Sequence, residues 1–131
     1  LEVDVLIIPQ VGPEVLTGST RMKAGAATKL VLNMITTGAM IKLGKTYGNL
    51  MVDLHPSNKK LVDRSQRIFG ALTDLSPRES SERLKQTDGD LKMALVMEMC
   101  SLQRSDARKL LHQCGGSVKK AVQQTLHQQG Q

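Results

Sequence analysis

The residues best suited to chemistry lie in one short stretch, residues 11–29, which is rich in Gly, Ala, Ser and Thr. Within it, Gly18, Ser19 and Thr20 stand where a loop is expected to become a helix, and Arg21 and Lys23 follow at once. The first N–H groups of a helix have no partner inside the helix and point outward with the positive end of its dipole. A helix start flanked by two cations predicts a site for a phosphate or a carboxylate. The same residues also fit an ordinary capped helix with solvated cations, because short glycine-containing motifs often arise by chance.

Glu14 is the one acidic residue of this stretch, and it allows two interpretations. Its carboxylate either contacts a hydroxyl group of a ligand or pairs with Arg21 or Lys23. Elsewhere the sequence shows no Ser/His/Asp or Cys/His set and no pair of carboxylates in an apolar setting. The three histidines have no metal-ligand spacing, so we predict neither a metal site nor a cofactor; they are His55, His112 and His127.

The element that must position this stretch is the apolar, β-branched run Val3–Ile8, which Pro9 closes. It predicts a strand buried on both faces, as in a parallel sheet. A lone strand is not stable, so its neighbours must come from missing chain or from a partner. Because the chain starts at Leu1 without an initiator Met, and its first residues already predict a buried strand, we expect a fragment of a longer protein. Ligands of parallel sheets bind beyond the carboxyl ends of the strands, where the loop of residues 10–18 would lie.

Long helices are predicted after this loop. The first covers residues 20–43 and contains the small-residue patch Ala24–Ala27, which suits close packing against another helix. Residues 47–54 predict either a strand or an irregular continuation of the helix. A second helix is predicted at residues 59–72, with Ser57 or Asn58 as its N-cap. Ser76, Pro77 and Glu79 form a capping-box pattern for a short polar helix that stops near residue 87.

Residues 90–131 predict a small bundle of three short helices. Ser105 is expected to cap the second helix, the glycine pair at 115–116 to end it, and Ser117 to cap the third. About 40 residues are few for independent stability, so we expect the bundle to dock on the rest of the protein. A helix-turn-helix reader of DNA is the alternative, but its recognition helix would offer only Lys119, Lys120 and several Gln.

The composition of the 131 residues argues against several partners. The net charge is +6, yet cations and anions alternate as on solvated helix faces. One Phe, one Tyr and no Trp leave little for stacking on bases, so we predict no nucleic-acid partner. No apolar run reaches the roughly 20 residues that span a bilayer, so we predict no membrane partner. Cys100 and Cys114 fit reduced thiols of a cytoplasmic protein.

Residues 12–54 closely resemble the signature region of the N-acetylmuramic acid 6-phosphate etherases. The matching motifs are, in order, GPE, TGSTRMKAG, LVLNM and YGNLMVDL. The glucokinase regulatory proteins share this signature, and both belong to the sugar isomerase (SIS) fold group. The glycine pair and the last amphipathic helix also resemble the small C-terminal module of the etherases. The resemblance therefore implies a mainly α fragment from the C-terminal part of an α/β SIS-type protein: one terminal parallel-type strand, long helices, and a three-helix, UBA-like bundle.

The resemblance implies a cytoplasmic bacterial enzyme of cell-wall sugar recycling that acts on a sugar phosphate. Such a lyase cleaves the lactyl ether of N-acetylmuramic acid 6-phosphate to N-acetylglucosamine 6-phosphate and D-lactate, by elimination and addition of water. The two catalytic glutamates of the family come from the preceding SIS region, which is missing here, so we expect no catalytic residue in this segment. The residues expected to bind substrate are Glu14, Gly18, Ser19, Thr20, Arg21 and Lys23.

The resemblance also implies a homodimer with sites near the subunit interface. We expect three parts: residues 1–73 as the end of the SIS domain, 74–89 as a linker with a short helix, and 90–131 as the C-terminal module. A non-catalytic, sugar-phosphate-binding regulatory protein of the same fold group is the alternative function. A basic helical module that binds nucleic acid is a third hypothesis, and it predicts affinity that falls steeply with salt.

Overall fold

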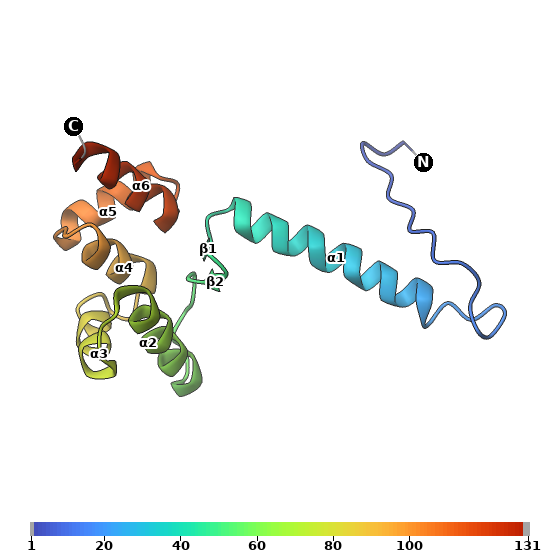
Figure 1. Cartoon of the computed structure of the whole chain (residues 1–131), viewed down its shortest axis with the longest axis horizontal. Coiled ribbons are helices and arrows are strands. Elements are labelled where there is room, and N and C mark those ends of the chain that lie inside the picture. Colours follow the sequence, from blue (N-terminus) through green and yellow to red (C-terminus); the bar gives the residue numbers. More distant parts are fainter. Residues whose placement is uncertain (1, 130–131) are drawn as a thin grey trace. The chain divides into compact units, whose positions relative to one another are not determined.

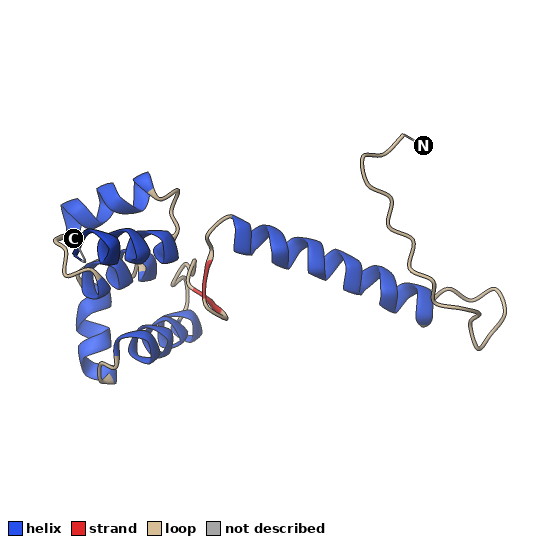
Figure 2. Ribbon diagram, turned by 45° about the horizontal axis from the view of Figure 1, so that its top comes forward, coloured by secondary structure: helices blue, strands red, loops and turns tan. Residues whose placement is uncertain are grey.

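The computed structural model describes residues 2–129, and these form six helices and one small hairpin (Figures 1 and 2). Two compact units divide the chain, one up to Ala39 and one from Met40 onward. No helix of the described part is both long enough and apolar enough to cross a membrane. The elements are α1 (Lys23–Lys42), β1 (Thr46–Tyr47), β2 (Leu50–Met51), α2 (Lys59–Thr73), α3 (Pro77–Lys85), α4 (Leu91–Met99), α5 (Arg104–Gln113) and α6 (Val118–Gln129).

The first unit contains an irregular segment, residues 2–22, followed by α1. The predicted strand at Val3–Ile8 is wrong for this structure, because these residues form neither helix nor strand. Their side chains are exposed, that of Val5 to 75%. A strand needs a neighbour whose N–H and C=O groups pair with its own, and the described residues of this unit supply none.

Helix α1 begins at Lys23, three residues later than predicted, and none of its 20 residues is buried. Apolar side chains occupy all sides of it, and Leu30, Leu32, Met34 and Ile35 are each more than half exposed. An apolar surface without a polar stripe is typical of a helix that other elements cover on several sides. The mainly α character predicted for the chain is confirmed; the SIS-type fold around α1 stays a prediction.

The chain leaves α1 through a left-handed glycine and enters a hairpin. Gly44 has φ 68°, and a Cβ there would lie 2.8 Å from Cβ of Ser117, so only glycine fits this position. Strands β1 and β2 then pair antiparallel, with Tyr47 opposite Leu50. Of the two predictions for residues 47–54, the strand is confirmed, although each strand has only two residues.

Side-chain caps define the starts of most helices in the second unit. Asn58 accepts a hydrogen bond from the N–H of Leu61, so it caps α2. The predicted capping box of Ser76 and Glu79 is present at α3. The predicted cap at Ser105 is wrong: the N-cap of α5 is Gln103, two residues earlier, and it makes no side-chain cap bond. The buried side of α5, which includes Ala107 and Leu111, packs into the core of the second unit.

The second unit has a continuous core centred on α4. This helix packs against α2, α5 and α6 (Figure 1). Leu95 and Val96 are fully buried, as are Phe69 of α2 and Val118 of α6. The three predicted helices after residue 90 are present, and Gly115 and Gly116 end α5 with φ 61° and 74°. The UBA-like geometry and the domain boundaries at residues 73 and 89 stay predictions.

Candidate functional site

The start of α1 binds a carboxylate from its own chain. The N–H of Lys23 donates to Oε2 of Glu14, and the N–H of Ala24 donates to Oε1, each at 3.1 Å. A carboxylate suits this place because these N–H groups have no partner in the helix and the dipole is positive there. The helix start thus holds the carboxylate of the chain's own Glu14, and binding of a ligand anion there stays a prediction. In this structure Glu14 is bonded to the backbone of Lys23 rather than to the side chain of either neighbouring cation.

Residues 18–22 are not helical and lead into α1, whereas the helix was expected to begin at residue 20. Gly18 has φ 82°, and the N–H of Ser19 donates to the carbonyl of Leu16 at 3.0 Å, which closes a tight turn. The carbonyl of Thr20 accepts from the N–H of Gly25 at 3.1 Å. The prediction that the helix begins at residue 20 is thus wrong, because the backbone reaches helical geometry only at Lys23.

The two predicted cations have different surroundings. Lys23 Nζ donates to the carbonyl of Pro13 at 2.8 Å, so this ammonium group ties the loop to the helix start. Arg21 is exposed, and within residues 2–129 no carboxylate forms an ion pair with it. Its guanidinium group presents five N–H donors and matches a phosphate or a carboxylate in two-point geometry.

An open groove of about 440 Å³ runs from Thr20, just before α1, along this helix to Asn33. Thr20 borders it at the start of the helix, and Thr28 and Lys29 border it farther along. The hydroxyl of Thr28 donates to the carbonyl of Ala24 at 2.9 Å. Thr28 and Lys29 were not among the residues predicted from the sequence, although Thr28 follows Ala24 by one helical turn and so lies on the same face of α1.

A second cluster of charges lies in the second unit. Asp53 bonds to Lys45 at 2.7 Å and to Lys92 of α4 at 3.2 Å. The hydrogen bond from Lys45 lowers the pKa of Asp53 most, Lys92 adds to this, and partial burial opposes both. The cluster ties the chain after the hairpin to the helical core. A cavity of about 380 Å³ lies beside it and is also bordered by His55.

Among the residues that the structure describes, no group of three or more His, Cys, Asp or Glu side chains gathers in a way that could hold a metal ion. Cys100 and Cys114 are both free and buried, and Sγ of Cys114 donates a hydrogen bond to Oε1 of Gln124 at 3.3 Å.

Comparison with known proteins relates the chain to a class of enzymes, the etherases. Three similar proteins share the name N-acetylmuramic acid 6-phosphate etherase. The one from Vibrio campbellii is 53% identical over 92% of this chain and 39% of its own length. The one from Clostridium beijerinckii is 50% identical over 94% of this chain and 40% of its own length. The one from Staphylococcus epidermidis is 54% identical over 86% of this chain and 38% of its own length. No protein-family model matches the chain.

The resemblance inferred from the signature motifs is confirmed, and the etherases are favoured over the regulatory proteins. The chain spans about two-fifths of the length of the curated relatives that it matches. The roles of the six predicted substrate-binding residues stay predictions; these are Glu14, Gly18, Ser19, Thr20, Arg21 and Lys23.

Proposed function

We propose that this chain is the C-terminal segment of an N-acetylmuramic acid 6-phosphate etherase. Identity at about half of the aligned positions, over nine-tenths of the chain, is the observation that carries the proposal. The whole protein would be a cytoplasmic lyase of cell-wall sugar recycling. It would release D-lactate and leave N-acetylglucosamine 6-phosphate.

The segment's part in this reaction is to bind the substrate. The reaction removes a proton beside the carbonyl of the open-chain sugar, expels lactate and adds water, which requires general acid and base groups. In the family these are two glutamates of the preceding SIS region. The segment alone is therefore inactive, and it needs neither a metal nor a cofactor for its role.

Arg21 is the residue we assign to the substrate anion. Glu14 occupies the backbone donors of the helix start, and Lys23 is held against Pro13. The guanidinium group of Arg21 stays available beside them and can take the phosphate or the lactyl carboxylate in two-point geometry. Ser19 and Thr20 offer hydroxyl groups next to it, and Gly18 allows the turn that presents them.

The proposal extends to the surroundings of α1. Apolar side chains on all sides of this helix suit contacts with the SIS region and with a second copy of the protein, so we propose a homodimer in which the segment lies near the interface. The small residues of Ala24–Ala27 favour a close approach of another backbone.

The test uses the full-length parent protein. It is expected to release D-lactate from N-acetylmuramic acid 6-phosphate. Arg21→Ala should lower kcat/KM, because the substrate anion would lose its charged partner in a desolvated site. The expected loss of transition-state stabilisation is about 2–5 kcal/mol. Arg108→Ala is the matched control, because Arg108 is an exposed arginine of α5, and its kinetics should equal those of the unaltered protein.

Two results would contradict the proposal. Near-normal kinetics of Arg21→Ala would remove the assignment of this residue. Release of lactate by the 131-residue chain alone, at the rate of the parent, would show that the catalytic carboxylates lie within it. Tight binding of the sugar phosphate by the parent without any lactate release would favour the regulatory alternative. Binding of nucleic acid that weakens steeply with salt would favour the third hypothesis.

A further inference from the structure

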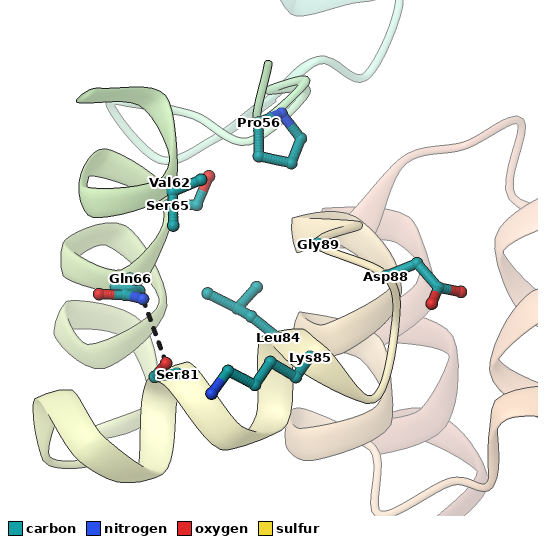
Figure 3. A pocket seen from close by; sticks show the side chains of 9 residues that line it. All are labelled: Pro56, Val62, Ser65, Gln66, Ser81, Leu84, Lys85, Asp88 and Gly89. Carbon is teal, nitrogen blue, oxygen red and sulfur yellow. Dashed lines mark hydrogen bonds between the residues drawn. The ribbon is translucent and has the colours of Figure 1, made fainter. Parts of the chain in front are cut away.

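A pocket of about 330 Å³ lies among α2, α3 and the turn that leads to α4 (Figure 3). It shares no residue with the signature loop. Its walls are mainly apolar and come from Pro56, Val62 of α2 and Leu84 of α3. This volume falls within the range of pockets that hold small organic molecules, which is roughly 300–1,000 Å³.

The pocket contains a buried hydroxyl group without a partner. Ser65 is 2% exposed, and its Oγ is the one buried side-chain oxygen or nitrogen of the described residues that has no hydrogen-bond partner. Figure 3 shows this oxygen on the side of α2 that faces the loop with Pro56. An unpaired buried hydroxyl is costly, so a ligand atom that bonds to it gains the whole hydrogen bond. Ser81 also borders the pocket, and its Oγ accepts a hydrogen bond from Nε2 of Gln66 at 3.2 Å.

The charge at the rim of the pocket favours an anion. Lys85 extends along the rim beside Leu84 (Figure 3), and none of the described carboxylates forms an ion pair with it. Asp88 is the one acidic residue among those that border the pocket. Its carboxylate points away from the pocket and bonds to Arg104 at 2.6 Å, so it does not neutralise the rim.

The wall formed by Pro56 is held in place by a glycine. Gly89 has φ 82°, and a Cβ there would lie 2.7 Å from Cγ of Pro56. The proline ring therefore rests directly on the backbone of the turn after α3. Two helices and this contact form the pocket before any ligand arrives, which lowers the entropy that a ligand would lose on binding.

We propose that this pocket binds a small organic anion with a short branched aliphatic body and a carboxylate. The aliphatic body lies against Pro56, Val62 and Leu84. One oxygen of the ligand takes the hydrogen bond of the Ser65 hydroxyl, and the ammonium group of Lys85 pairs with the carboxylate. This site follows from the second unit alone, so it does not depend on the function proposed for the signature loop.

The probe for the test is isovalerate, and isovaleramide is its uncharged match. Each is titrated into the 131-residue chain while the ¹H–¹⁵N spectrum is recorded. Isovalerate should cause saturable shifts of amides in α2, α3 and residues 86–89, with a Kd in the millimolar range because so few atoms bind. Isovaleramide should bind about tenfold more weakly, because it lacks the charge that pairs with Lys85.

Three variants separate the contributions of the pocket. Lys85→Gln should raise the Kd of isovalerate about tenfold, and Ser65→Ala about fivefold, through the loss of an ion pair and of a hydrogen bond. Ser65→Ala keeps a helix-compatible residue and removes a hydroxyl that has no partner, so this variant should fold. Lys120→Gln, which alters an exposed lysine of α6, should leave the Kd unchanged.

The proposal is overturned by any of three results. The first is the absence of saturable shifts, which is expected if the pocket holds only water. The second is equal affinity for isovaleramide, which would show that the rim does not select an anion. The third is an unchanged Kd in both Lys85→Gln and Ser65→Ala, which would place the probe elsewhere.

Discussion

Two helices of this protein, α1 and α4, are both strongly apolar, yet their surroundings are opposite. Helix α4 has nine residues, of which Leu91 and Met93–Val96 are buried. Helix α1 has 20 residues, of which none is buried. The difference lies in what the chain supplies around them, because α2, α5 and α6 cover α4. An apolar helix thus indicates that a core is needed, but the covering elements decide whether one forms.

The largest expected difference in stability is between alanine variants of two leucines, one in each helix. Leu95→Ala in α4 should lower the free energy of unfolding by about 2–5 kcal/mol, because loss of a fully buried side chain leaves a cavity. Leu32→Ala in α1 should change it by less than about 0.5 kcal/mol, since this side chain is 57% exposed. Urea unfolding of the 131-residue chain, followed by circular dichroism, measures both.

The same pair of variants gives a second test in the full-length parent. There, Leu32→Ala should become costly, by about 2–5 kcal/mol, if the SIS region or a second subunit covers α1. An effect as small as in the 131-residue chain would show that α1 stays uncovered, and it would count against the proposed packing.

Alanine variants of two glycines are expected to change stability in opposite directions. Gly44→Ala should destabilise the second unit by roughly 1–3 kcal/mol, because alanine is strained at φ 68° and its Cβ would press on Ser117. Gly38→Ala should stabilise α1 by about 0.5–1 kcal/mol, because Gly38 lies within this helix and a Cβ there meets nothing within 4 Å. Thermal unfolding and helix content by circular dichroism measure both, and equal effects would contradict the contrast between the packed and the uncovered unit.

A smaller effect than those of Leu95 and Gly44 is expected at Asp53, whose two lysine partners join the hairpin region to the core of the second unit. Its pKa in the folded chain is lower than the ordinary value of 3.8, chiefly through the hydrogen bond from Lys45. The stabilisation is therefore fully present above that value and is lost as the pH falls through the folded pKa. Asp53→Asn should lower stability at pH 7 by on the order of 1 kcal/mol, since the pair is partly exposed.

The measurement for Asp53 is thermal unfolding between neutral pH and the acid range. The variant should approach the unaltered chain as the pH falls below the ordinary carboxyl pKa. A constant difference in melting temperature over the whole range would show that the carboxylate charge of Asp53 does not contribute. Asp63→Asn is the matched control, because Asp63 forms an exposed pair within one helix and should have little effect.

Local signals in the sequence predicted much of the second unit. The capping box at Ser76 and Glu79 and the cap at Asn58 are set by residues within one turn, so they could be recognised directly. The start of α5 was misplaced because Gln103 and Arg104 carry no cap signal. The cluster around Asp53 was missed, since Lys92 is far from it in sequence and only folding brings them together.

In residues 11–29, too, some features follow from local sequence signals and others only from the folded structure. Its residue types alone indicated an anion site at a helix start, and the motifs indicated the family. The sequence could not decide where the helix begins, because Gly18, Ser19 and Thr20 suit a turn as well as a cap. The backbone of Lys23 and Ala24 meets the carboxylate of Glu14, nine and ten residues earlier, and that choice among partners belongs to the folded loop.

The helix content, most of the caps, the glycine turns and the relation to the etherases could all be read from the sequence, because each depends on neighbouring residues or on an ordered motif. Which apolar segments are buried depended instead on tertiary contacts. Val3–Ile8 and α1 are rich in apolar residues, as α4 is, but strands and helices bury their side chains only against other elements. The residues from Met40 onward contain those elements for α4, and the described residues of the first unit contain none for α1.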